Sequence, residues 1–198
     1  YNHRIQKVTN EPQIIIPAGQ TSAALTITGI DDAIYESDET IILTPTASGA
    51  VLTSSDAISI ALTDNDLPAV VTLVTATTAD GAYKEGQVIA ITVTFDKAVT
   101  VTGTPQLTLE TGSSDALVNY SSGSGSNTLT FNYTVASGHS SGDLDYVATS
   151  SLALNSGTIK DVAGNVATLT LASPGASGSL GANKALAIIP TVTLSSNA

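Results

Sequence analysis

The sequence contains no cysteine, no methionine and no tryptophan among its 198 residues. Without cysteine it cannot form disulfides, thiolate zinc sites or a cysteine nucleophile. Its two histidines, His3 and His139, lie far apart in the chain and offer little material for histidine-based metal or acid–base chemistry. Aromatic residues are also few, six tyrosines and two phenylalanines, and no aromatic platform for a sugar is evident.

Positive charge is scarce as well, because six Lys and Arg face seventeen Asp and Glu, which gives a net charge of −11. Such a surface repels phosphate backbones and anionic lipids, so we expect no nucleic-acid partner and no membrane insertion. The apolar runs are too short to span a bilayer. Because the chain begins at Tyr1 rather than at Met, we expect it to be a piece of a longer protein.

What the sequence does contain is strand-like alternation. Short apolar–polar segments are bounded by Gly, Pro, Asn, Asp or Ser, which is typical of strands, and no window keeps the 3.6-residue period of a helix. Many short strands at regular spacing predict an all-β fold of tandem immunoglobulin-like antiparallel β-sandwiches. The main alternating segments are residues 24–30, 57–62, 88–95, 107–109, 129–135, 167–171 and 185–188.

A module boundary is predicted at Leu67–Pro68, where one strand has ended and a proline precedes the next. A similar stretch, residues 188–194 (IIPTVTL), resembles the first strand of a following module. We therefore divide the chain into residues 1–68, 69–189 and 190–198, a window on a tandem array.

Acidic residues gather in the first of these parts, where residues 1–68 carry a net charge of −7. Strand 22–30 leads into an acidic turn, strand 40–45 runs back, and strand 57–63 runs forward again, so strand parity brings the acids of residues 64–66 to the same end. Calcium takes six to eight oxygen ligands, mostly from carboxylates, carbonyls and water. We predict a calcium site there, and a solvated acidic turn is the simpler alternative. The turn is residues 31–39 (DDAIYESDE), and the second cluster is Asp64 and Asp66.

This pattern resembles a Calx-beta domain over about residues 13–66. The resemblance is carried by residues 14–22 (IIIPAGQTS), 30–40 (IDDAIYESDET) and 60–66 (IALTDND). It implies that calcium binds at one end of an immunoglobulin-like sandwich. Calx-beta domains are longer, so this chain matches only their second half, which would leave a sheet edge exposed. The residues that match the family's calcium ligands are Asp31, Asp32, Glu36, Asp64 and Asp66, whereas Asp38 and Glu39 match less closely.

Residues 70–188 are similar to the bacterial immunoglobulin-like repeats of large surface adhesins. The motifs that carry this resemblance are residues 103–109 (GTPQLTL), 122–125 (SGSG), 143–146 (DLDY) and 157–165 (GTIKDVAGN). The resemblance implies a secreted or cell-surface, non-catalytic stalk made of many modules.

Other acidic residues offer weaker candidates. Asp80, Glu85, Asp143 and Asp145 are expected at the far end of the second part, either as a second cation site or as turn-forming residues, and the turn role is favoured. Asp96 begins a loop that returns towards the predicted boundary.

We predict no enzymatic activity, because the carboxylates lie on turns, His139 lies in a glycine-rich and exposed loop, and no nucleophile elbow is present. The function expected is a calcium-binding extender segment of an extracellular bacterial adhesin, whose partners are neighbouring modules of the same chain. The alternative is a module that binds carbohydrate or a host protein.

Overall fold

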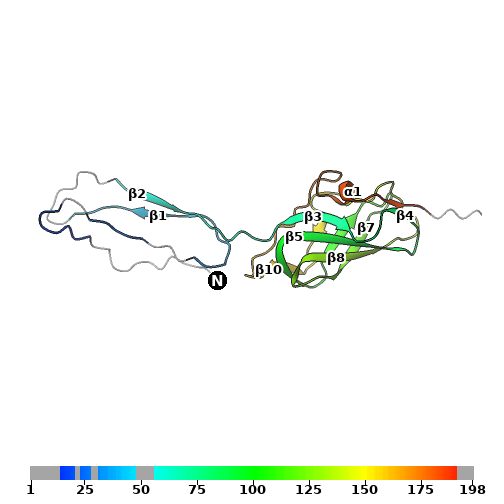
Figure 1. Ribbon diagram of the computed structural model, residues 1–198, viewed down its shortest axis with the longest axis horizontal. Coiled ribbons are helices and arrows are strands. Elements are labelled where there is room, and N and C mark those ends of the chain that lie inside the picture. The colour runs from blue at the N-terminus through cyan, green and yellow to red at the C-terminus, as the bar shows by residue number, and fades with distance from the viewer. Residues whose placement is uncertain (1–13, 21–22, 28–30, 48–55, 191–198) are drawn as a thin grey trace, which may run out of the picture. The chain divides into compact units, whose positions relative to one another are not determined.

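A computed structural model describes residues 14–20, 23–27, 31–47 and 56–190 of the chain (Figure 1). The chain divides into two units, residues 1–32 and residues 33–198.

In the first unit, a tight turn is the main local feature. The backbone N–H of Gln20 donates to the carbonyl of Pro17 at 3.0 Å, and Gly19 has a φ of +85°. A positive φ at the third position of a turn suits glycine, which has no Cβ to clash. The strand predicted at residues 24–30 is not formed in its described part, since residues 24–27 are exposed and belong to no strand. Residues 28–30 lie outside the described part of the chain.

The second unit begins with a small sheet of two antiparallel strands, β1 (Glu39–Leu43) and β2 (Ile58–Leu62). Their register pairs Ile41 with Ile60 and Leu43 with Ile58, so one face of the pair is apolar. No residue of either strand is fully buried. A two-stranded sheet is marginally stable alone, and in the described chain the core lies elsewhere.

The main body is one large, curled antiparallel sheet (Figure 1). The long strand β5 organises it, since β8 pairs along one edge while β3 and β10 share the other. β7 then links β8 to β6, and β6 pairs with β9. The strands are β3 (Val71–Ala76), β5 (Val88–Thr102), β6 (Gln106–Leu109), β7 (Ala116–Ser122), β8 (Ser126–Thr134), β9 (Leu152–Ala153) and β10 (Thr158–Asp161).

A second small sheet closes one end of this body. Strand β4 (Gly81–Tyr83) pairs in parallel with β11 (Leu186–Ile188), next to the one-turn helix α1 (Leu180–Asn183). No helix was expected from the sequence. The hydroxyl of Ser179 caps this one by accepting the backbone N–H of Ala182, a local interaction too short to leave a periodic signal.

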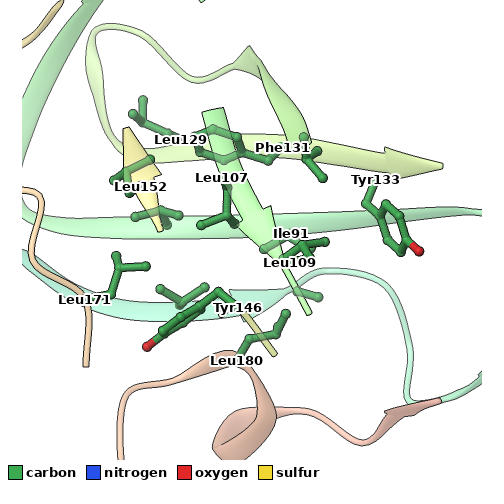
Figure 2. Close-up of a cluster of buried hydrophobic side chains, with 14 of the residues drawn as sticks. Ile91, Leu107, Leu109, Leu129, Phe131, Tyr133, Tyr146, Leu152, Leu171 and Leu180 are labelled. Atoms are coloured by element: carbon green, nitrogen blue, oxygen red, sulfur yellow. The ribbon is translucent and has the colours of Figure 1, made fainter. Parts of the chain in front are cut away.

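The hydrophobic core lies between Ala69 and Ile188. Figure 2 shows part of it, with Leu107, Leu109 and Phe131 packed together and Leu180 contributed from α1. The hydroxyl of Tyr133 points away from this cluster, at its edge. The largest fully buried side chains are Tyr133, Tyr146, Phe95, Phe131, Ile89, Ile91, Leu107, Leu109, Leu129, Leu144, Ile159 and Leu180.

The all-β prediction is confirmed at the level of a β-rich chain with almost no helix. One predicted strand is again absent, because residues 167–171 form only a single bridge, from Thr168 to Val70. The predicted boundary at Leu67–Pro68 falls inside the second unit and stays a prediction. Within the described ranges, no helix is long and apolar enough to cross a bilayer.

Candidate functional site

The β1–β2 pairing brings two acidic segments together. Glu39, the first residue of β1, lies opposite Leu62, the last residue of β2. The residues that precede β1 therefore lie beside those that follow β2, in the way that strand parity predicted. Both segments are described as part of the second unit.

Hydrogen bonds join these segments through carboxylates. Asp64 Oδ2 accepts the backbone N–H of Glu36 at 2.6 Å, and Asp64 Oδ1 accepts that of Asp66 at 3.0 Å. In return, the backbone N–H of Asp64 donates to Asp38 Oδ1 at 3.1 Å. Glu36, Asp64 and Asp66 are half-buried. Backbone N–H groups therefore partly offset the negative charge of the Asp38 and Asp64 carboxylates.

The predicted ligands are thus placed unequally. Glu36, Asp64 and Asp66 lie together, with Asp38 beside them, whereas Asp31 and Asp32 belong to the first unit. Among the described residues, no group of three or more His, Cys, Asp or Glu side chains is arranged to hold a metal ion. The five-residue ligand set remains a prediction.

An asparagine that the sequence did not single out binds the same region. Asn165 Oδ1 accepts the backbone N–H of Tyr35 at 2.9 Å, and Asn165 Nδ2 donates to the carbonyl of Ala33 at 3.1 Å. The side-chain amide therefore bonds to the backbone of two residues, Ala33 and Tyr35, that are two positions apart, as a neighbouring strand would. We call this pair of contacts the Asn165 bracket.

The Asn165 bracket is built on a tight loop after β10. Asp161 Oδ1 accepts the backbone N–H of Asn165 at 2.9 Å, and Asp161 Oδ2 accepts Asn165 Nδ2 at 3.2 Å. Gly164 makes the turn possible with a φ of +98°. Asp161 and Asn165 are buried, and their polar atoms are paired, which fixes the amide orientation.

Two further contacts link this region to the core sheet. The ammonium of Lys97 donates to the carbonyl of Leu67 at 2.6 Å. Asp96 Oδ1 accepts the backbone N–H of Val70 at 2.8 Å, close to the predicted boundary. The expectation that Asp96 begins a loop was wrong, because β5 continues through this residue to Thr102. A hollow of about 270 Å³ lies here, lined by Ala33, Asn65, Asp66, Leu67, Lys97, Ala98, Asp161, Val162, Ala163 and Asn165.

Two of the other acidic candidates, Asp80 and Asp145, bind neighbouring protein groups near the opposite end of β5. Asp80 forms an ion pair with Lys184, with 2.8 Å between Oδ1 and Nζ, and the hydrogen bond from Lys184 lowers the pKa of Asp80. Asp145 accepts the backbone N–H of Tyr146 at 2.9 Å and that of Gly175 at 2.8 Å. These contacts favour the turn-forming role over a second cation site.

The expectation that His139 is exposed in a flexible loop was wrong. Its ring is half-buried, lies nearly parallel to the Tyr133 ring, and shares a 2.8 Å hydrogen bond with the Tyr133 hydroxyl through Nδ1. Burial raises the pKa of Tyr133 to about 12, so this hydroxyl stays protonated at neutral pH. His139 is therefore a packed residue at the edge of the core.

Comparison of the chain with models of protein families, with curated proteins and with solved structures found no match. The resemblances to a Calx-beta domain and to bacterial immunoglobulin-like repeats stay predictions. The proposals that follow are therefore drawn from this chain's own residues and contacts.

Proposed function

We propose that this chain is a calcium-binding structural segment of a large, extracellular bacterial adhesin-like protein. In this proposal, calcium neutralises the acids beside the module boundary and fixes the two flanking modules in one orientation. The observation that supports it best is the convergence of residues 36–38 with residues 64–66 next to Leu67–Pro68.

The chemistry of the donors fits a hard cation. An ionised carboxylate offers about four lone-pair positions, so Asp64 can accept two backbone N–H groups and still offer an oxygen. Calcium also uses backbone carbonyls and water, which lowers the number of carboxylates that it needs. Glu36, Asp64 and Asp66 would hold the ion, and the resemblance to a Calx-beta domain implies Asp31 and Asp32 as further ligands.

Calcium would supply positive charge where the sequence has little. Residues 1–68 carry nine acidic and two basic residues, and the ammonium of Lys97 donates to the Leu67 carbonyl beside the acidic segments. Because the ion would bind the folded state, it would stabilise that state by mass action. The Asn165 bracket would hold residues 33–35 in place whether or not the ion is bound.

The proposed architecture is a series of immunoglobulin-like β-sandwiches, with residues 1–68, 69–189 and 190–198 belonging to successive modules. The confinement of the core to residues 69–188 supports the middle module. Exposed isoleucines such as Ile15, Ile42 and Ile58 support the idea that the first module is incomplete in this chain. The proposed partners are neighbouring modules, and the proposed location is the cell surface or the extracellular medium.

Thermal unfolding in calcium and in EDTA tests the proposal. Extracellular calcium modules have Kd values of about 10⁻⁴ to 10⁻³ M, so about 10 mM calcium should stabilise the chain by roughly 1.4–2.7 kcal/mol. For a domain of this size the melting temperature should rise by about 3–10 °C. Asp64→Asn should lose most of that rise, whereas Asp115→Asn, the same change at an exposed residue outside the acidic segments, should keep it.

The proposal would be refuted if calcium did not raise the melting temperature of the parent chain. An equal rise in both variants would show that the ion binds elsewhere. The comparison uses the difference between calcium and EDTA for each variant, because Asp64→Asn also removes backbone hydrogen bonds that stabilise the calcium-free chain.

A second candidate function, ligand binding, is favoured by a cleft of about 510 Å³ between β7 and β8, a volume within the range of small-molecule sites. Tyr133 is buried and Tyr120 only half-exposed there, so they provide no open aromatic face for a sugar. Binding of the chain to a glycan array would favour a carbohydrate ligand.

A further inference from the structure

We infer that the cleft between β7 and β8 is a docking site for an extended peptide, which pairs with both strands as an added strand. This inference goes beyond the structural role proposed above, since it needs neither calcium nor a neighbouring module. It rests on how the two strands separate and on which backbone groups they turn towards each other.

The two strands are neighbours for only part of their length. Their register pairs Tyr120 with Phe131 and Ser122 with Thr130, with an irregularity at Ser121. There the hydroxyl of Ser121 accepts the backbone N–H of Asn132 at 3.1 Å, in place of a ladder carbonyl. Beyond this point, no pairing joins residues 116–119 of β7 to residues 132–134 of β8, all of which lie in the described chain.

The ladder pattern fixes which groups of β7 face the opening. In a strand with an antiparallel neighbour on each side, the backbone groups of successive residues point alternately to one neighbouring strand and to the other. The backbone N–H of Tyr120 donates towards β6, to Pro105, whereas that of Thr108 in β6 donates away from β7, to Ser151. Thr108 is the register partner of Leu117. The N–H and C=O groups of Leu117 and Asn119 therefore point away from β6, into the cleft.

The same alternation applies to β8. The backbone N–H of Val135 donates towards β5, to Gln87. The carbonyl of Ala90, the register partner of Asn132, instead accepts from Thr77 on the other side of β5. The backbone groups of Asn132 and Thr134 therefore point towards β7. Because the N–H of Asn132 is bonded to Ser121, the strand edge on this wall consists of the Asn132 carbonyl and the backbone groups of Thr134.

The size and charge of the cleft match an extended, basic peptide. Four residues of strand span about 13 Å, which is the length of the β7 wall. Asp115 is the carboxylate of the lining, and no Lys or Arg contributes to it. Together with the net charge of −11, this favours a peptide that carries Lys or Arg near the Asp115 end. His139 and the Tyr133 hydroxyl lie in the same lining.

Strand addition draws its affinity from main-chain hydrogen bonds and its specificity from alternate side chains. Leu117, two-thirds exposed, and the exposed Asn132 and Thr134 are the side chains placed to contact the peptide. A soluble glycan cannot reproduce the alternating donors and acceptors of two strand edges. The two ligand classes therefore differ in what they require of the β7 backbone.

The test selects phage-displayed random peptides of about eight residues, enough to cover the β7 wall and its flanks, against the full chain in EDTA. Peptides that bind should move the amide NMR signals of Leu117, Asn119, Asn132 and Thr134. Asn119→Pro removes the cleft-facing N–H but no backbone bond to β6, a position where a strand tolerates proline. It should weaken binding at least about tenfold. Asn119→Ala keeps that N–H and should bind within about threefold of the parent chain. Both Asn119→Pro and Asn119→Ala remove the bond from Gln106 Nε2 to Asn119 Oδ1, so the two variants differ in the backbone N–H.

A second measurement keeps the test valid if Asn119→Pro does not fold. The selected peptide is methylated on alternate backbone nitrogens, which blocks strand pairing along one edge, and the parent chain should bind it at least about tenfold more weakly in one of the two methylation patterns. The inference is overturned if no peptide is enriched, if both methylated peptides bind undiminished, if Asn119→Ala abolishes binding, or if the shifted signals lie outside the cleft.

Discussion

Removal of the Asn165 amide should measure how firmly residues 33–35 are held to the core sheet. Asn165→Ala deletes the contacts to Tyr35 and Ala33 and the charge-assisted bond to Asp161. Two neutral hydrogen bonds contribute about 0.5–1.5 kcal/mol each and a bond to a charged group about 1.5–3 kcal/mol. These contributions sum to about 2.5–6 kcal/mol, and we expect the free energy of unfolding to fall by an amount in the lower half of that range because the contacts to Tyr35 and Ala33 are only partly buried.

Urea unfolding gives this value, and hydrogen exchange locates it. The amide of Tyr35 should lose protection in Asn165→Ala, whereas the amide of Gly164, bonded to the Asp161 carbonyl, should change less. The matched control is Asn127→Ala, the same change at an exposed residue near the start of β8, where less than about 0.5 kcal/mol is expected.

Asn165→Asp separates hydrogen bonding from charge. The new carboxylate can still accept the N–H of Tyr35, but it lies beside the buried carboxylate of Asp161. Like charges at this distance raise a carboxyl pKa, so this variant should be the less stable of the two near neutral pH and should recover part of the loss as the pH falls. Stability within about 0.5 kcal/mol of the parent chain, with unchanged exchange at Tyr35, would refute the role given to the Asn165 bracket.

Two further predictions concern the core. Burial raises the pKa values of Tyr133 and Tyr146 to about 12. Because both exceed the unfolded value of about 10, the free energy of unfolding should stay level below pH 10 and fall between pH 10 and 12, by about 2 kcal/mol for each tyrosine. Two of the six tyrosines should ionise only together with loss of structure by circular dichroism, and ionisation of all six near pH 10 in the folded chain would show the burial to be wrong. Leu109→Ala, at a fully buried site, should cost about 2–5 kcal/mol. Leu117→Ala, at an exposed site, should cost less than about 0.5 kcal/mol, and equal losses in urea unfolding would contradict this placement of the core.

Local patterns predicted much of the β structure. The alternation in residues 57–62, 88–95 and 129–135 agrees with β2, the first half of β5 and most of β8. The same alternation failed at residues 24–27 and 167–171, because a strand also needs a partner, and alternation says nothing about where that partner lies. Strand parity placed residues 36–38 beside residues 64–66 because β1 and β2 pair as antiparallel neighbours.

Such local patterns could not predict the Asn165 bracket. Asn165 lies 130 residues from Tyr35, and its sequence context reads simply as a turn. The available signal was the polar loop of residues 161–165 after an alternating strand, but nothing local says which backbone it binds. The prediction for His139 failed because its glycine-rich neighbours indicated an exposed loop, whereas the ring pairs with Tyr133, which lies six residues earlier.

The most direct measurement for the proposed calcium site is a set of amide NMR spectra of the chain, recorded in EDTA and then in about 10 mM calcium. The account expects saturable shifts for Glu36, Asp64 and Asp66 and for the predicted ligands Asp31 and Asp32, while signals from the buried core stay in place. Spectra that coincide at these five residues would contradict the claim that an ion binds the acids beside Leu67–Pro68.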